Sequence, residues 1–380
     1  MEKKSHMESM EMTNFKQIYK DKTIFITGNT GFMGTWLTLW LSSLEANVIG
    51  FSNKIFPKNF VSDYLVNEGK IKQEIQDIND LEVLKKCVSE NKPEFIFHLA
   101  AQPLVHTSYQ NPVLTFQTNV MGTINVLEAV RNCSSVKSCI IVTSDKCYDN
   151  KEINYAYKET DPLGGHDPYS ASKGAAEIVT ASYKNSFFNE DGEKTKISTV
   201  RAGNIIGGGD WAENRIVPDC ISSIIQKKPI EVRSPKSIRP WQYALEPISG
   251  MLLLAHKMIE NKELTNSWNF GPKSSSEDIT VKKLVELIIK KWGKGRWNDI
   301  SAESKKIPHE AKHLMLDSNK AMSKLKWSPT YTLEEAIGET VNWYKHNSEN
   351  PSKMYEFSLK QIENYILRAK KMNMSWAIDV

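Results

Sequence analysis

The chain has 380 residues, of which 40% are hydrophobic and 25% are charged, and its formal net charge is +4. This composition excludes a collagen-like or fully disordered chain. A nucleic-acid partner is disfavoured, because Lys and Arg are scattered rather than gathered into a basic stripe. No segment reaches the roughly 18 apolar residues of a membrane span. The five cysteines show neither zinc-site pairing nor a disulfide framework, so we expect reduced thiols and no metal site. Because no membrane span is found and no secretory signal precedes the first strand, we expect a cytoplasmic protein.

Residues 1–20 mix charges with methionines and lack the apolar stretch of a secretory signal, so we expect a partly disordered leader. From residue 22, short β-branched runs alternate with segments of helical period, which is typical of parallel β-α-β units. The predicted strands are Thr23–Thr27, Asn47–Phe51, Lys72–Ile75, Phe95–His98, Ser138–Thr143 and Ser198–Arg201. Apolar-periodic helices are predicted to begin near Gly31, Asp80, Thr115 and Pro168.

Beyond Asn204 the pattern changes to Gly-rich and Pro-rich loops, which predicts a second domain. The expected fold is α/β: a Rossmann-like doubly wound parallel sheet formed by residues 21–204 and about 241–262, with a smaller mixed α/β substrate domain formed by 205–240 and 263–350. The second part is predicted to hold helices at Pro247–Ile259, Val281–Trp292 and after Leu333, and a short strand at Trp268–Phe270. Residues 351–380 resemble an amphipathic helix, which we expect to face solvent or another subunit.

The first predicted strand runs into a glycine-rich turn with the spacing G-x-x-G-x-x-G. A dinucleotide pyrophosphate needs backbone N–H groups at a helix N-terminus and no Cβ in its way, and glycines after a first strand provide both. Three glycines alone could also shape an ordinary tight turn. In this context they predict cofactor binding by Gly28, Thr30, Gly31, Phe32, Met33 and Gly34.

The residues after the second strand leave the choice between NAD and NADP open. NAD sites usually place an acidic residue there, and NADP sites an Arg. This chain has Ser52, Asn53 and Lys54 instead. Lys54 favours NADP on charge alone, although an ordinary exposed lysine is the simpler interpretation.

Tyr169 and Lys173 lie four residues apart at a helix start and therefore share one helix face. A phenol with a reference pKa of about 10 is a poor general base near neutrality, and a nearby ammonium lowers that pKa. Ser144, after the fifth strand, is placed to bind the hydroxyl that Tyr169 deprotonates. Asp145 and Lys146 add an acid and an amine, which elimination of water requires and simple dehydrogenation does not. The alternative is a polar loop with an incidental ion pair.

At these motifs the chain, from about Lys20 to Trp343, resembles the extended short-chain dehydrogenases. Phe97–Pro103 resembles the cofactor segment of the fourth strand, Thr118–Val120 the next helix, and Arg239–Tyr243 the Arg motif that grips a nucleotide diphosphate. The Ser144-Asp145-Lys146 form, with Gly207–Trp211, is similar to the members that dehydrate CDP-glucose.

The resemblance implies a 4,6-dehydratase that keeps NAD bound and uses a nucleotide sugar, CDP-glucose, as substrate. Asp145 is implied as the acid for the departing 6-hydroxyl, and Lys146 either as the base at C5, which would need a depressed pKa, or as a cation that stabilises the enolate. The resemblance further implies a homodimer or homotetramer formed through the helices near Asn119 and Tyr169. It assigns cofactor contacts to Asp77, Ile78, Leu99, Ala100, Ala101, Gln102, Asn119, Tyr169 and Lys173. Substrate contacts are expected from Ser144, Asn204, Arg215 and Arg239; the motif supports Arg239, whereas Arg215 rests on position alone and an ordinary surface arginine is its alternative.

Two other functions remain open. An epimerase or plain oxidoreductase of the same family would use Ser144, Tyr169 and Lys173 alone. A catalytically silent module would bind the dinucleotide only, which the intact trio argues against.

Overall fold

A seven-stranded parallel sheet forms the centre of the protein in the computed structural model, which describes residues 14–56, 62–189, 195–272, 279–302 and 313–378. The strand order is β11-β7-β5-β4-β1-β2-β3. The strands are β1 (Thr23–Thr27), β2 (Asn47–Ser52), β3 (Ile71–Ile75), β4 (Phe95–His98), β5 (Ser138–Val142), β7 (Lys196–Arg201) and β11 (Ser267–Asn269). The six strands predicted for the first domain are confirmed, as is the α/β fold class.

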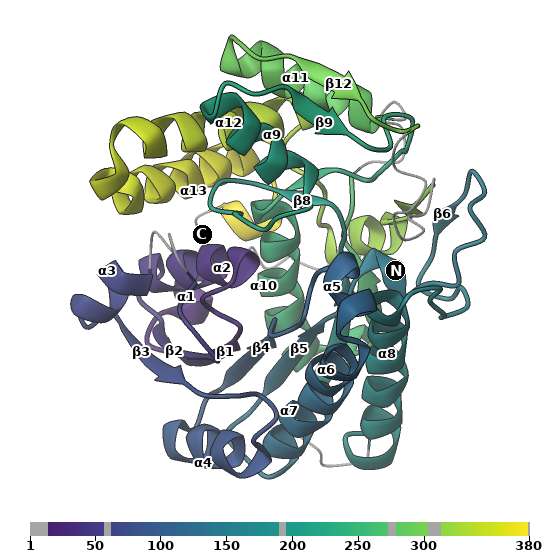
Figure 1. Ribbon diagram of the computed structural model, residues 1–380. Helices are drawn as coiled ribbons and strands as arrows, with labels where there is room; N and C mark the ends of the chain where they lie inside the picture. Colours follow the sequence, from purple (N-terminus) through teal and green to yellow (C-terminus); the bar gives the residue numbers. More distant parts are fainter. Residues whose placement is uncertain (1–13, 57–61, 190–194, 273–278, 303–312, 379–380) are drawn as a thin grey trace, which may run out of the picture.

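Helices cover both faces of this sheet (Figure 1). Successive residues of a strand point to opposite faces, so Ile24 and Ile26 enter one hydrophobic core while Phe25 enters another. The helices of the first part are α1 (Phe15–Tyr19), α2 (Phe32–Ser43), α3 (Ser62–Asn67), α4 (Leu81–Asn91), α5 (Val105–Gln110), α6 (Pro112–Phe116), the π-helix η1 (Gln117–Met121), α7 (Gly122–Arg131), the 3₁₀ turn η2 (Asp145–Cys147) and α8 (Pro168–Phe187). The core around Phe25 is completed by α4, α7 and α8, and the opposite core by α2 and residues of the second part.

Most of the second part lies over the carboxyl ends of the central strands, toward the top of Figure 1, whereas its helix α10 packs against the sheet beside β5. Its helices are α9 (Ile216–Ile225), α10 (Leu245–Glu260), η3 (Lys262–Leu264), α11 (Val281–Trp292), η5 (Ala321–Leu325), α12 (Leu333–Glu349), η6 (Pro351–Lys353), α13 (Met354–Lys371) and η7 (Ser375–Ala377). Three two-stranded parallel sheets pair β10 (Gln242–Tyr243) with β8 (Ile205–Ile206), β12 (Trp297–Asp299) with β9 (Ile230–Val232), and β13 (Met315–Leu316) with β6 (Ala156–Tyr157).

The short strand expected near Trp268 lies elsewhere than predicted. The sequence division assigned it to the second domain, whereas β11 joins the central sheet beside β7, with Trp268 opposite Val200. Hydrogen bonding to the open edge of β7 extends the sheet by one strand. The remaining domain boundaries stay a prediction.

Both ends of the described chain pack into the core. Residues 1–13 of the predicted leader lie outside the described residues, but α1 is ordered, and Tyr19 is fully buried and donates a hydrogen bond to Leu252 O at 2.6 Å. The expectation of a solvent-facing or subunit-facing tail is wrong for the apolar side of α13, because Ile362 and Tyr365 are buried. Trp376, beyond α13, stacks on Phe15 with ring centroids 5.0 Å apart.

Among the described residues, no helix combines the length and the apolar character that crossing a membrane requires.

Candidate active site

A cavity of about 890 Å³ opens where the central strands end, between the sheet and the second part of the chain. β1 is flanked by β4 on one side and β2 on the other, so the chain winds away from β1 in both directions. Open α/β sheets hold ligands at such a switch point. Every residue predicted to bind cofactor or substrate or to act in catalysis lines this cavity, except Gln102 and Asn119.

The glycine turn leaves no room for side chains at two of its positions. Gly28 has a φ of +73°, and a Cβ there would lie 2.6 Å from Ala100 N. A Cβ at Gly34 would lie 2.1 Å from Gly28 O. Gly31 is the N-cap of α2 and contributes no side-chain cap, so the first turn of α2 borders the cavity with its backbone. This arrangement fits a dinucleotide pyrophosphate.

Thr30 stands where the commoner fingerprint has its second glycine, and its side chain has a structural partner. Its Oγ1 donates to Lys54 O at 2.7 Å, which fastens the loop after β2 to the turn. The carbonyl of Lys54 is therefore part of the turn's framework.

Gln102 and Asn119 do not line the cavity but join two segments that do. Asn119 Oδ1 accepts the Gln102 N–H at 2.8 Å, and Asn119 Nδ2 donates to Gln102 O at 3.1 Å and to Ser172 Oγ at 2.8 Å. This clamp ties the segment after β4 to α8, the helix that carries Tyr169 and Lys173. Gln102 and Asn119 do not line the cavity, so the structure gives no support to their predicted direct contact with the cofactor.

Ser144 and Asp145 follow β5 and form a hydrogen-bonded pair at the cavity. Ser144 caps η2, accepting the Lys146 N–H at 3.2 Å, and its Oγ donates to Asp145 Oδ1 at 2.9 Å. Asn204 Nδ2 donates to Asp145 Oδ2 at 3.0 Å. Asp145 reaches this position only because residue 203 is glycine, where a Cβ would lie 1.8 Å from Asp145 Oδ2.

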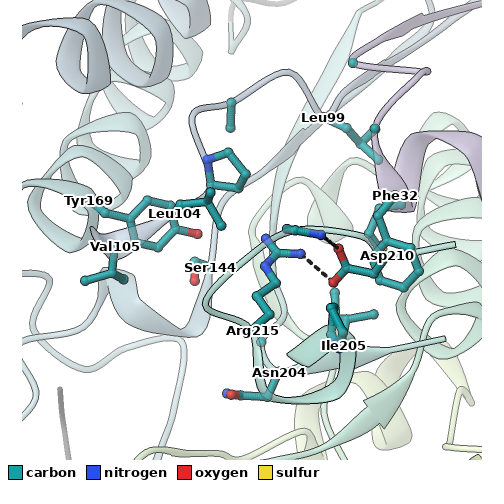
Figure 2. A pocket seen from close by; sticks show the side chains of 18 of the residues that line it. Phe32, Leu99, Leu104, Val105, Ser144, Tyr169, Asn204, Ile205, Asp210 and Arg215 are labelled. Carbon is teal, nitrogen blue, oxygen red and sulfur yellow. Dashed lines mark hydrogen bonds and ion pairs between the residues drawn. The ribbon is translucent and has the colours of Figure 1, made fainter. Parts of the chain in front are cut away.

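Tyr169 comes from the first turn of α8 and points its hydroxyl toward Ser144 (Figure 2). Lys173, one turn further along α8, donates from Nζ to Val142 O at 3.2 Å. The helix start is fixed by Asp167, whose carboxylate accepts the Ser170 N–H at 3.0 Å. Two segments, the junction of β5 with η2 and the first turns of α8, thus bring Ser144, Asp145, Tyr169 and Lys173 to one wall of the cavity.

Burial dominates the protonation of these groups. It raises the pKa of the Asp145 carboxyl above its usual value, against the opposing effects of the Lys146 ammonium and the Ser144 hydroxyl. It raises the pKa of Tyr169 to about 12, although a hydrogen bond with Ser144 acts in the opposite direction. Burial lowers the pKa of Lys173 to about 8. The expectation that a nearby ammonium lowers the phenol pKa is not met in the protein alone, because desolvation dominates and the pKa of Tyr169 rises.

Two arginines face the cavity from the second part. Arg239 is buried, and its Nη1 donates to Ile238 O at 2.9 Å. Its positive charge opposes the rise in the pKa of Asp145 that burial causes. Arg215 forms an ion pair with Asp210 Oδ2 at 2.9 Å, which Figure 2 shows beside Phe32. Asp210 was not assigned by sequence reasoning, although it lies in the Gly-Gly-Gly-Asp-Trp segment.

A buried ion pair behind the site was also missed. Glu177 Oε2 and Arg201 Nη2 are 2.8 Å apart, with side chains only 2% and 3% exposed. Glu177 also accepts from Thr143 Oγ1 at 2.5 Å, immediately before Ser144. The available signal was spacing, since Glu177 follows Tyr169 and Lys173 at successive four-residue steps on the same helix face.

Comparisons with known proteins agree with this geometry. A family model described as GDP-mannose 4,6 dehydratase matches residues 25–340. The chain is similar to a CDP-glucose 4,6-dehydratase of Salmonella typhimurium, with 41% identity over 336 residues that cover 87% of this chain and 92% of that protein. It is also similar to a dTDP-glucose 4,6-dehydratase of Xanthomonas campestris, with 23% identity covering 86% and 93% of the two chains.

Among solved structures, a dTDP-glucose 4,6-dehydratase from Bacillus anthracis in complex with NAD shares the fold. The TM-score is 0.72 at 22% identity, and the match covers 86% of this chain and 98% of that one.

Proposed function

Because the chain belongs to the GDP-mannose 4,6 dehydratase family, we propose that it is a lyase that converts CDP-glucose to CDP-4-keto-6-deoxyglucose and water. The relative named CDP-glucose 4,6-dehydratase, 41% identical over most of both chains, supports the reaction and the nucleotide. The observation that carries the proposal is a buried carboxyl, Asp145, hydrogen-bonded to Ser144 beside Tyr169. An acid at this point has a use in elimination and none in simple oxidation.

NAD is the cofactor that fits the cavity. The backbone at Gly28 and Gly31 offers a pyrophosphate site at the start of α2, and Asp77 and Ile78 line the same cavity after β3. The segment after β2, with Asn53 and Lys54, has no Arg to accept a 2′-phosphate. Bound NAD supplies the acceptor and later the donor of the hydride that leaves C4 and arrives at C6.

The side chains of the site divide the proton chemistry between them. Tyr169 takes the proton of the 4-hydroxyl, with Ser144 holding that oxygen. This step needs the phenolate, which the hydrogen bond with Ser144 favours and burial, by raising the pKa of Tyr169 to about 12, opposes; the positive charge of Lys173 is assigned to stabilising it. The resulting 4-ketone acidifies the C5 hydrogen. Asp145 then protonates the 6-hydroxyl as it leaves, and the raised pKa of this carboxyl favours the protonated form that an acid needs.

Lys146 is the remaining ionisable group at the centre. It is half-buried, follows Asp145 directly and lines the cavity. We assign it to the C5 step, either as the base or as the cation beside the enolate. Following the exchange of the C5 hydrogen with solvent deuterium in Lys146→Met tests the assignment, and unchanged exchange would remove Lys146 from both roles.

The substrate's diphosphate is assigned to Arg239. A guanidinium suits bidentate phosphate recognition, and Arg239 is buried at the cavity wall with its charge close enough to act on Asp145. Arg215 is already paired with Asp210, so its contribution is shared with that carboxylate. Asn204, which lines the cavity and donates to Asp145 Oδ2, is assigned to the sugar.

We further assign a homo-oligomer to the helices near Asn119 and Tyr169. Apolar side chains are exposed there, including Val113 (68% exposed) on α6, Met121 on η1 and Ile178 (59% exposed) on α8. α6 contacts both η1 and α8, so these side chains lie on neighbouring elements. A second copy that covers them would bury this apolar area.

The test is direct. The purified protein is incubated with CDP-glucose, and the absorbance that a 4-keto-6-deoxy sugar develops in alkali is followed, with the dTDP, UDP and GDP sugars alongside. Signal with CDP-glucose alone is expected. A retained 6-hydroxyl in the product would indicate the epimerase, and silence with all four sugars would indicate a module that binds dinucleotide without catalysis.

A further inference from the structure

The orientation of the Asp145 carboxyl depends on two residues between β7 and β8. Asn204, labelled in Figure 2, donates from Nδ2 to Asp145 Oδ2 at 3.0 Å, and the missing side chain of Gly203 leaves the space that the carboxyl occupies. A third contact, the hydrogen bond from Ser144 Oγ at 2.9 Å, comes from the adjacent residue and moves with Asp145. Gly203 and Asn204 therefore decide where the carboxyl lies relative to the rest of the cavity.

One residue holds the backbone of both. Gln242, the first residue of β10, donates from Nε2 to Gly203 O at 3.2 Å, and its backbone N–H donates to Asn204 O at 3.2 Å. The same Nε2 donates to Phe270 O at 2.8 Å. Phe270 follows β11 and donates its own N–H to Arg201 O, at the end of β7, at 3.0 Å. Gln242 thus fastens the segment that touches the carboxyl to the edge of the main sheet.

The surroundings of Gln242 indicate that its amide donors are what the position requires. The side chain is only 4% exposed and does not line the cavity, so any effect on the reaction passes through other residues. Its Oε1 is buried without a hydrogen-bond partner among the described residues. Such an atom costs stability, which an apolar side chain of similar size would avoid. Asn204 in turn needs support, because its φ of +49° lies in the left-handed region that side chains rarely adopt.

We propose that Gln242 is a positioning residue, which keeps the acid Asp145 aimed at the departing 6-hydroxyl by fixing Gly203 and Asn204. This inference rests on the function proposed above. Oxidation at C4 depends on Tyr169, which α8 holds independently of Gln242. The hydride taken from C4 returns to the sugar, at C6, only after the 6-hydroxyl has left. A misplaced acid therefore leaves the cofactor reduced and the sugar as a 4-ketone that still carries its 6-hydroxyl.

Stopped-flow absorbance of the reduced nicotinamide, recorded with CDP-glucose, compares wild type with Gln242→Met. Methionine is close to glutamine in size and lacks the amide donors. We expect reduced cofactor to accumulate in the variant and kcat for the 4-keto-6-deoxy sugar to fall by about tenfold or more, because the acid is displaced. KM should not change, since Gln242 does not line the cavity.

Gln361→Met is the matched control. Gln361 is also buried, and its Nε2 also donates twice, to Glu339 O and to Glu339 Oε2, both at 2.8 Å. Neither residue lines the cavity. Its Oε1 accepts from the Tyr243 hydroxyl of β10 at 3.4 Å, so the control disturbs β10 while keeping the bonds of Gln242. It should lose stability in urea unfolding without accumulating reduced cofactor.

A double-mutant cycle with Asp145→Asn tests whether the effect passes through this carboxyl. In that background Gln242→Met should lower kcat no further, because no acid remains to be positioned. An additive loss of kcat, or a Gln242→Met enzyme that accumulates no more reduced cofactor than Gln361→Met, would refute the proposal.

Should Gln242→Met not fold, Gln242→Asn, whose amide is one methylene shorter, replaces it with the same expectation. Failure of both variants to fold would make the side chain purely structural and would also overturn the inference. Wild type that forms no 4-keto sugar would overturn the proposed function, whereas contrary results confined to the variants overturn this inference alone.

Discussion

Replacing Glu177 by Gln tests whether its buried ion pair with Arg201 holds the end of β5, which leads into Thr143 and Ser144, in place. The carboxylate of Glu177 neutralises Arg201 at 2.8 Å and accepts hydrogen bonds from Thr143, Thr199 and Ser267. The substitution preserves size but leaves the Arg201 charge buried without its counter-ion. Breaking one side of such a pair costs about 3–5 kcal/mol of unfolding free energy. Because Thr143 directly precedes Ser144, kcat should fall as well.

Urea unfolding measures this loss, and Glu94→Gln serves as the control. Glu94 pairs with Lys137 at 2.6 Å, but the Lys137 side chain is 51% exposed. Exposed pairs contribute about 0–1 kcal/mol, because solvent screens them. A loss in Glu177→Gln no larger than in Glu94→Gln would refute the reasoning that this network supports the site.

Three further substitutions probe the site and its scaffold. Gly203→Ala would place a Cβ 1.8 Å from Asp145 Oδ2, so kcat should fall by about 100-fold because the carboxyl is displaced. The control Gly338→Ala, with nothing within 4 Å of its Cβ, should keep wild-type kinetics. Equal kcat values in the two variants would contradict the steric argument. Arg239→Ala should raise KM for the nucleotide sugar by about 10- to 100-fold through loss of a charge-assisted hydrogen bond, with partial recovery in Arg239→Lys, and an unaltered KM would mean that the diphosphate lies elsewhere. Burial raises the pKa of Glu246 from 4.5 to about 7. The folded state therefore holds this proton to higher pH than the unfolded chain does. The stability that the group contributes below pH 4.5 is lost as the pH rises through 7. Glu246→Gln should remove that pH dependence, which is worth roughly 3 kcal/mol of unfolding free energy at 1.36 kcal/mol per pKa unit. Chemical unfolding from pH 4.5 to 8 measures it. Stability curves that run parallel in wild type and variant would exclude Glu246 as the cause.

Local patterns were sufficient where neighbouring residues alone decide the structure. The runs Thr23–Thr27 and Phe95–His98 read as buried parallel strands because they are short and apolar, and the structure places both at the centre of the sheet. The glycine turn and the four-residue step from Tyr169 to Lys173 were likewise visible, because turn geometry and helix periodicity depend on sequence spacing. The roles proposed for these residues remain predictions.

Contacts between distant segments were beyond sequence reasoning. Trp268 pairs with β7 across a long sequence separation, and nothing in its own run distinguishes an edge strand of the main sheet from one in the second part. Gln102 and Asn119 resemble cofactor contacts by motif, yet the Asn119 side chain bonds to the Gln102 backbone and to Ser172 on α8, and the Gln102 side chain bonds to Leu104 and Thr115. Motifs specify residue types, whereas the packing around them decides which atoms face the cavity.

The sequence by itself determined the parallel sheet, the glycine turn at its first strand and the group of ionisable residues expected at the strand ends, because each depends on local periodicity, turn chemistry or motif spacing. Only the tertiary structure decided how those residues behave. Desolvation, and not the charge of Lys173, dominates the pKa of Tyr169. The absence of a side chain at Gly203 admits the Asp145 carboxyl. Both effects arise from atoms that approach across the fold, and spacing along the chain does not encode such distances.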